Sequence, residues 1–194
     1  EAHMGEDITD DQLVARTQQG DKQAFDLLVR KYQYKVVKLV SRYVNHADAE
    51  DVAQESFIKA YRAMKGFKGN SAFYTWLYRI SINTAKNHLV ARSRRPASQD
   101  IDVADAEIFG YADRFSEQDT PEALLESEEI RNAVFTTIEA LPEDLRTAIM
   151  LRELEGMSYE EIAQAMDCPV GTVRSRIFRA RAAVEERLQS LGDN

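Results

Sequence analysis

The chain has 194 residues, of which 44% are hydrophobic and 30% charged, enough apolar material for one domain or two small ones. No stretch approaches the roughly 18 apolar residues of a membrane span, and no signal peptide is recognisable at the N-terminus. One cysteine and three scattered histidines exclude an intrachain disulfide and argue against a metal site built from these residues. We therefore expect a cytoplasmic protein without a metal or a cofactor, and we interpret residues 1–5 as a cloning remnant.

Charge is distributed unevenly along the chain, although the net charge is −8. Residues 1–95 carry 16 basic and 11 acidic side chains, residues 96–130 carry 1 and 11, and residues 131–194 carry 8 and 11. A basic segment is thus followed by a strongly acidic one. Because nucleic acid responds to charge within a Debye length of about 8–10 Å, the acidic total does not exclude DNA binding.

Helical periodicity dominates the first half of the sequence. Apolar residues recur at spacings of three and four within residues 21–43, 49–64 and 71–90, which predicts three long helices after a short N-terminal one. Asp21 is expected to cap the first long helix, and Ser71 to start the third after a glycine-rich loop. We assign four apolar residues of the third helix to the core: Phe73, Trp76, Leu77 and Ile80.

The second half begins with a segment of different character. Residues 97–120 show no sustained apolar period, and we expect a mobile or extended linker there. Pro121 opens a further helix, and Leu141-Pro142 separates it from the next, which runs to about Leu154. No β alternation is present. The sequence predicts an all-α fold with a first helical domain, an acidic flexible linker and a second helical domain, over residues 6–95, 96–120 and 121–194 respectively.

Residues 158–188 show a helix-turn-helix pattern. Ser158 and Glu161 have the spacing of a capping box at the start of a short helix. A tight break over residues 167–171 follows, and Thr172 is expected to start a second helix. The second helix has an apolar stripe for burial, made of Val173, Ile177, Ala180 and Val184.

The second helix of this motif is rich in arginine. Four arginines and no acidic residue lie between positions 174 and 181, whereas a solvated αα-hairpin would have acids among them. Such a helix can enter the major groove and offer guanidinium groups to guanine edges or phosphates. This favours DNA recognition over a solvated hairpin. Arg152, on the preceding helix, fits a phosphate contact and a surface ion pair equally well.

Two further surfaces are suggested by spacing in the first half. Asp51, Gln54, Glu55 and Ile58 share one helix face, which suits docking of a basic protein helix. On spacing alone, a solvated face over a core stripe of Val52, Phe57 and Tyr61 is favoured. Further along, aromatic residues alternate with polar ones around the glycine-rich loop, a composition that can hold unstacked bases. The candidates for DNA contact there are Phe67, Asn70, Tyr74, Asn83 and Lys86.

Four stretches in this order resemble the extracytoplasmic-function, or group IV, RNA polymerase sigma factors of the sigma-E/AlgU envelope-stress type. They are DVAQESFIKAY (51–61), SAFYTWLYRI with NTAKN (71–80 and 83–87), LPEDLR (141–146), and YEEIA through PVGTVRSRIFRAR (159–163 and 169–181). Together they cover nearly the whole chain except the linker.

The resemblance implies a sigma region 2 domain, a sigma region 4 domain and a role for each surface. Asp51, Gln54, Glu55 and Ile58 would bind the β′ coiled coil of core RNA polymerase, and the C-terminal domain would meet the β flap. The minus-ten element would be opened and held by Phe67, Asn70, Ser71, Tyr74, Asn83 and Lys86. The minus-thirty-five element would be read by Arg174, Ser175, Phe178 and Arg179, supported by Arg152, Arg176 and Arg181.

The resemblance also implies how such a chain is used and regulated. It would be a dissociable initiation subunit for promoter DNA, not an enzyme, with its linker threaded through polymerase channels. A membrane-anchored anti-sigma factor would hold it inactive at the inner membrane, and we expect neither membrane insertion nor a stable homodimer. The alternative is a free-standing helix-turn-helix regulator. A metal-dependent hydrolase that uses Asp100, Asp102 and Asp105 is disfavoured, because the sequence offers these acids no partner histidine or nucleophile. We expect Cys168 to be a packing thiol.

Overall fold

The structure is a computed structural model that describes residues 8–94 and 121–192. Within these ranges every regular element is helical, which confirms the expected all-α fold. The expected linker, 96–120, lies outside the described residues. The elements are α1 (Asp10–Gln18), α2 (Lys22–Val40), α3 (His46–Ala63), the 3₁₀ turn η1 (Met64–Gly66), α4 (Phe73–Ser93), α5 (Pro121–Glu139), α6 (Glu143–Glu153), α7 (Tyr159–Met166) and α8 (Val170–Gly192).

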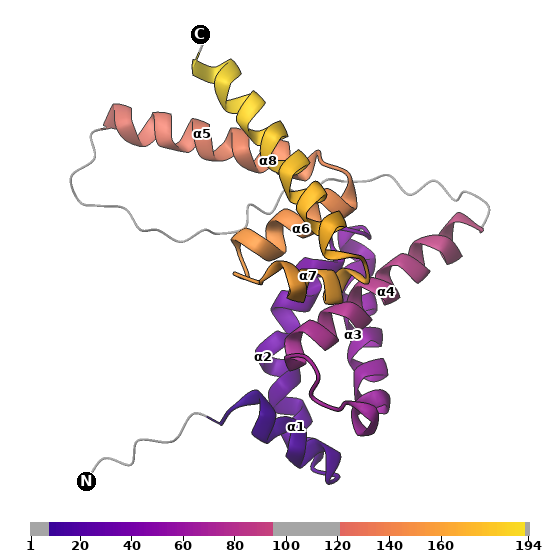
Figure 1. Ribbon diagram of the computed structural model, residues 1–194. Helices are drawn as coiled ribbons and strands as arrows, with labels where there is room; N and C mark the ends of the chain where they lie inside the picture. The colour runs from indigo at the N-terminus through magenta and orange to yellow at the C-terminus, as the bar shows by residue number, and fades with distance from the viewer. Residues whose placement is uncertain (1–7, 95–120, 193–194) are drawn as a thin grey trace, which may run out of the picture.

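Helices α1–α4 form the N-terminal half, and α5–α8 form the C-terminal half (Figure 1). Asp21 caps α2 as expected, since its carboxylate accepts hydrogen bonds from the backbone N–H groups of Gln23 and Ala24. The start of α4 was predicted wrongly: the cap is Ala72, and the helix begins at Phe73. The Ser71 hydroxyl donates to the Ala72 carbonyl instead of accepting a helix N–H.

The apolar stripe of α4 is only partly buried. Phe73 and Leu77 lie in the core as predicted, with exposed fractions of 2% and 0%. Trp76 and Ile80 are half-buried at its edge, because the helix turns them toward the loop and the solvent. Tyr61 of α3, expected in the core stripe, is 40% exposed and packs on Phe25 with the two rings tilted and their centroids 5.0 Å apart.

The helix-turn-helix is formed by α7 and α8. Ser158 and Glu161 make the predicted capping box. The turn begins at Asp167, whose φ of 52° lies in the left-handed region. Helix α8 begins at Val170 rather than at Thr172, since the Pro169 carbonyl already accepts the N–H of Thr172 at 3.0 Å. Of the predicted buried stripe, Val184 is only half-buried, and the three other members are buried.

The two halves pack against each other along α4, with α7 beside it (Figure 1). Buried apolar residues of both halves form one continuous cluster that includes Leu77 of α4 and Ile162 of α7. The packing places the glycine-rich loop, the start of α4 and the helix-turn-helix near one another. This arrangement decides which candidate residues are open to a partner.

We expect Ser158→Ala to lower the free energy of unfolding by about 0.5–2 kcal/mol, because it removes the N-cap of α7. Chemical denaturation followed by circular dichroism measures the effect. Thr136→Ala, at an exposed position of α5, is the control and should cost nothing, since alanine has the higher helix propensity. Equal stabilities of the Ser158→Ala variant and the parent would contradict the capping argument.

Candidate nucleic-acid interface

The acidic face of α3 is assembled as its spacing predicted. Asp51, Gln54, Glu55 and Ile58 all lie on the exposed side, and Ile58 is 47% exposed. The opposite side of α3 carries buried Val52. Among the four, Glu55 pairs with Lys59 one turn on, at 3.2 Å. The face is therefore a polar surface with an apolar centre, and it faces away from the core of the N-terminal half.

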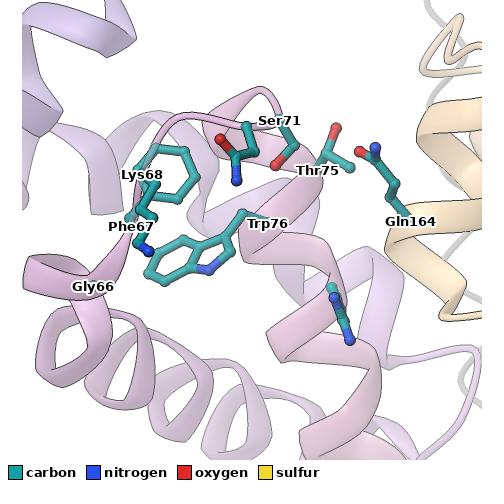
Figure 2. A pocket seen from close by; sticks show the side chains of 9 residues that line it. Gly66, Phe67, Lys68, Ser71, Thr75, Trp76 and Gln164 are labelled. Atoms are coloured by element: carbon teal, nitrogen blue, oxygen red, sulfur yellow. The ribbon is translucent and has the colours of Figure 1, made fainter.

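A hollow of about 330 Å³ lies between the glycine-rich loop and the first turns of α4. Figure 2 shows Phe67 and Trp76 on one side and Ser71, Thr75 and Gln164 on the other. The Phe67 and Trp76 rings are 4.9 Å apart between centroids, so the hollow has an aromatic wall. Its lining residues are Gly66, Phe67, Lys68, Asn70, Ser71, Thr75, Trp76, Arg79 and Gln164.

The loop that forms this hollow is anchored from α1. The Gln18 amide donates to the carbonyl oxygens of Met64 and Phe67, at 3.0 and 2.9 Å. Gly69 has a φ of 72°, which a residue with a side chain adopts only with strain. The loop thus has a defined shape, and it presents an aromatic surface together with amide and hydroxyl groups. That combination can stack a base and hydrogen-bond its edge.

The six residues predicted to contact the minus-ten element fall into two sets. Phe67, Asn70 and Ser71 line the hollow. The other three follow α4 away from it: Tyr74, Asn83 and Lys86. Asn83 is exposed, whereas the side chains of Tyr74 and Lys86 contact acidic residues of the C-terminal half. The structure therefore does not gather all six around one cavity.

Sequence reasoning missed several lining residues. Arg79 follows Trp76 by three positions, so helical spacing could have placed it on the same side of α4. Trp76 was assigned to the core because aromatic residues at helical spacing usually are buried, yet its ring lines the hollow. Gln164 comes from α7, and no local pattern could have brought it to a loop almost a hundred positions earlier.

The arginine-rich face of α8 is open. Arg174, Ser175, Phe178 and Arg179 are exposed, and Phe178 is 75% exposed. Arg174 and Phe178 are one turn apart, as are Ser175 and Arg179, so the four side chains form one patch. Beneath them Val173 and Ile177 are buried, which fixes the orientation of the patch. A guanidinium fork in this position can reach guanine edges in a major groove.

The three supporting arginines already have partners within the chain. Arg152 donates to the Met157 carbonyl at 2.8 Å and lies over the Tyr159 ring, 4.9 Å from its centroid. Arg181 pairs with Glu153 at 2.6 Å. Arg176 is 17% exposed and lies 3.4 Å from the carboxylate of Asp144. Each contact would have to be shared or broken for these arginines to bind phosphate.

A tyrosine–glutamate contact joins the two halves. The hydroxyl of Tyr74 donates to the carboxylate of Glu161. This hydrogen bond is the main cause that lowers the pKa of Glu161 and raises that of Tyr74 to about 12. The charged carboxylate and the neutral phenol are therefore the favoured forms at neutral pH.

This shift predicts a loss of stability in acid. A lowered carboxyl pKa contributes stability that is present above its unfolded value and is lost as the pH falls through the folded value. The free-energy difference between the parent and Glu161→Gln should thus be constant near neutrality and shrink below about pH 4. Urea titrations of both proteins at a series of pH values measure it. A difference that stays constant down to about pH 3 would contradict the assignment.

Across the described parts of the chain, 8–94 and 121–192, no helix is long and apolar enough to cross a membrane. In those parts no three His, Cys, Asp or Glu side chains are grouped so as to hold a metal ion. The metal-dependent alternative would use Asp100, Asp102 and Asp105, which lie outside the described residues. Cys168 is half-buried, its sulfur accepts a hydrogen bond from Arg176 at 3.6 Å, and burial raises the pKa of its thiol.

Each half of the chain matches the model of a known protein family. Residues 28–95 match the family model "Sigma-70 region 2", and residues 131–184 match "Sigma-70, region 4". The sigma-E factor of Salmonella typhimurium is 63% identical over 188 residues, covering 97% of this chain and 98% of that protein. The sigma-E factor of Escherichia coli K12 is 62% identical, with the same coverage.

Solved structures agree on the fold. CnrH, solved in complex with the cytosolic domain of CnrY, is 27% identical to this chain and has a TM-score of 0.61, covering 92% of this chain and 96% of CnrH. The sigma factor RpoE of Bartonella quintana, solved with the anti-sigma factor NepR, has a TM-score of 0.58 at 24% identity, covering 85% and 96%. With both sigma regions matched and identity above 60% along almost the whole length, the chain belongs to the ECF RNA polymerase sigma factors of the sigma-E type, which initiate transcription and are not enzymes.

Proposed function

We propose that three surfaces of this sigma factor divide the work of initiation. The acidic face of α3 docks on the β′ coiled coil of core RNA polymerase, with the β flap meeting the C-terminal half. The loop of residues 66–71 and α4 hold the opened minus-ten element, and the exposed face of α8 reads the minus-thirty-five element. The observation that carries the proposal is the α8 patch of Arg174, Ser175, Phe178 and Arg179. Its Phe178 side chain is 75% exposed among arginines instead of being buried in the core.

The hollow beside the loop suits a single unpaired base. Its aromatic wall of Phe67 and Trp76 offers a stacking surface, and Asn70 and Ser71 offer hydrogen-bonding groups. Stacking of a base on an aromatic side chain contributes about 1–3 kcal/mol. Since the loop is held by Gln18, little ordering is needed when a base binds. These features support a flipped, non-template base as the occupant.

We expect Asp51→Ala with Glu55→Ala to weaken binding to core polymerase by about tenfold, since two charge contacts of roughly 0.5–1 kcal/mol are lost. Fluorescence-detected titration of labelled core measures the affinity. The fold should be intact, because both side chains are exposed. Asp11→Ala with Asp26→Ala, exposed on α1 and α2, is the control with the same charge change. Unchanged affinity of the first variant would remove this face from the docking surface.

Regulation by an anti-sigma factor is part of the proposal. A related fold, CnrH, is found in complex with the cytosolic domain of CnrY, and the two sigma-E factors compared above are more than 60% identical to this chain. We propose that a membrane-anchored anti-sigma factor holds this chain in the cytoplasm, at the inner membrane, until envelope stress removes it. Co-purification of the tagged chain from unstressed cells tests the partner. Recovery of the free chain alone from such cells would contradict it.

A further inference from the structure

Acidic side chains are absent from a long stretch around the glycine-rich loop. Between Glu55 and Asp100 the sequence has no aspartate or glutamate, although the stretch contains many lysines and arginines. The first four cations of this stretch follow one another at every third position, from the last turns of α3 through η1 into the loop: Lys59, Arg62, Lys65 and Lys68. Positive charge is thus concentrated where the loop leaves α3.

Three of these four cations have no acidic partner in the structure. Lys59 pairs with Glu55 at 3.2 Å, whereas no carboxylate of residues 8–94 and 121–192 lies within ion-pair distance of Arg62, Lys65 or Lys68. All three side chains are exposed, and we call these three residues the basic end of α3. Because neighbouring like charges repel one another, binding of an anion among them is favoured.

The basic end adjoins the hollow that is proposed to hold a base. Lys68 lines the hollow together with Phe67 (Figure 2), and so does Gly66, the residue after Lys65. Arg62 and Lys65 are three positions apart across the junction of α3 and η1, which places them on one side with their Cβ atoms about 5–6 Å apart. Cations therefore continue from the wall of the hollow along the end of α3.

The backbone of the basic end is held in place from α1. The Gln18 amide donates to the carbonyl oxygens of Met64 and Phe67, and each of these residues directly precedes a lysine of the basic end. The backbone that carries Lys65 and Lys68 is thereby fixed, while both side chains are exposed. An anion that binds there has little backbone to order.

The charge of the basic end favours a nucleic acid over polymerase as its partner. The neighbouring docking face, with Asp51 and Glu55, is acidic and suits a basic helix. Arg62 lies on the same side of α3, one turn beyond Ile58, and would repel such a helix. A strand whose base occupies the hollow carries a negative phosphate on each side of that base. The basic end supplies the countercharge for one of these sides.

A strand can leave the hollow in two directions. One follows α4, whose Asn83 and Lys86 belong to the proposed minus-ten contacts, toward the end from which the chain continues to the C-terminal half. The other passes over the loop to the basic end. The minus-thirty-five element, which we assign to the C-terminal half, lies upstream of the minus-ten element. The path along α4 therefore leads upstream, and the path over the basic end leads downstream.

We propose that Arg62, Lys65 and Lys68 bind phosphates of the non-template strand directly downstream of the base held in the hollow. The proposal rests on the proposed minus-ten function and extends its site to the end of α3. Guanidinium and ammonium groups hold phosphate oxygens by charge-assisted hydrogen bonds, and each neutralised phosphate releases counterions. These contacts carry no sequence information, so they stabilise the opened strand on every promoter.

The test measures binding of the holoenzyme, core polymerase saturated with the full chain, to a labelled promoter fragment recovered by run-off transcription. The fragment carries a non-complementary bubble over the minus-ten element. Each phosphate contact on a single strand contributes about −0.7 to the slope of log affinity against log salt concentration. Arg62→Gln with Lys65→Gln should therefore make the slope shallower by about 1.4 and weaken binding roughly tenfold at about 100 mM salt.

Two control variants accompany this double variant. Arg30→Gln with Arg187→Gln removes the same charge from exposed positions of α2 and α8 and should leave the slope unchanged. Arg62→Lys with Lys65→Arg keeps both charges and should retain the parental slope. Should the double variant fail to fold, Lys65→Gln alone should make the slope shallower by about 0.7.

Three outcomes overturn the proposal. One is a parental slope in the folded double variant or in Lys65→Gln. Another is an equally shallow slope in either control variant, which would show a general effect of charge or of damage to the fold. The third is weaker binding to core polymerase without DNA, together with a parental slope on DNA, which would make polymerase the partner of the basic end.

The place of the contact on the strand is tested with uncharged methylphosphonate linkages, introduced one at a time into the non-template strand. The parent should lose affinity at linkages directly downstream of the held base, and the double variant of Arg62→Gln with Lys65→Gln should lose little more there. The held base is the one whose removal weakens the parent but not Phe67→Ala. Equal sensitivity of the parent and the double variant at these linkages would contradict the proposal.

Phe67→Ala also separates this proposal from the minus-ten function. It removes one ring of the aromatic wall and should weaken binding about fivefold or more at every salt concentration, with the slope unchanged. Parental binding by Phe67→Ala would reject the minus-ten function. Weakened binding by Phe67→Ala, with a parental slope in the double variant, would reject the role of the basic end alone.

Discussion

Arg174→Ala is expected to weaken binding of the minus-thirty-five element by about 1–3 kcal/mol, roughly 5-fold to 150-fold, when the contact is bidentate to one base pair. The side chain is exposed at the start of α8, within the patch that contains Phe178. Its guanidinium lies 6.0 Å from the centroid of the Tyr159 ring, a contact that orients it without burying it. Removing this side chain should therefore weaken DNA binding without destabilising the fold.

Polymerase holoenzyme binding to a promoter series with single base changes measures this loss. A base-specific contact gives a loss confined to one position of the upstream element, and the variant then no longer distinguishes bases there. Equal losses on every promoter would show a phosphate contact instead. Arg187→Ala, at an exposed site further along α8, is the matched control and should leave the affinity unchanged. No loss on any sequence would contradict the assignment of the α8 patch.

Ile177→Ala should lower the free energy of unfolding by about 2–5 kcal/mol, the largest effect expected of a single substitution in the recognition helix. The side chain is 1% exposed and packs beneath the arginine patch. Truncation removes its buried surface and leaves a cavity that the neighbouring helices can fill only in part. Denaturation by urea, followed at 222 nm, measures the loss.

Promoter recognition should fall together with stability in Ile177→Ala, since α8 loses the support that orients Arg174 and Phe178. Phe178→Ala provides the contrast, because its side chain is 75% exposed and makes little of the core. That variant should lose DNA binding while keeping the stability of the parent. A Phe178→Ala variant as unstable as Ile177→Ala would show that Phe178 has a structural role and would weaken the proposed recognition face.

Local features of the fold were predictable because their determinants are local. The cap of α2 by Asp21 and the capping box of Ser158 with Glu161 depend on residues within a few positions of each other. The start of α4 was misplaced by two positions because serine favours both caps and turns, and here the Ser71 hydroxyl bonds to the Ala72 carbonyl. Element boundaries of this kind depend on competing short-range hydrogen bonds.

The candidate surfaces were predictable to different degrees. Spacing alone placed Asp51, Gln54 and Glu55 on one exposed helix face. It could not show that Arg176 would be drawn to Asp144, or that Gln164 would reach the loop hollow. Both depend on how the two halves pack, and no periodicity within either half encodes that. The occupation of α4 by acids of the other half is therefore a property that only the tertiary structure reveals.

Run-off transcription tests the central claim most directly. Purified core RNA polymerase is supplied with fragmented bacterial DNA, with and without this chain, and the transcripts are sequenced. The account predicts new transcripts that depend on the chain and start downstream of a shared two-part motif, and it predicts that they disappear with Arg174→Ala combined with Phe178→Ala. No stimulation by a folded chain and an active core would contradict it.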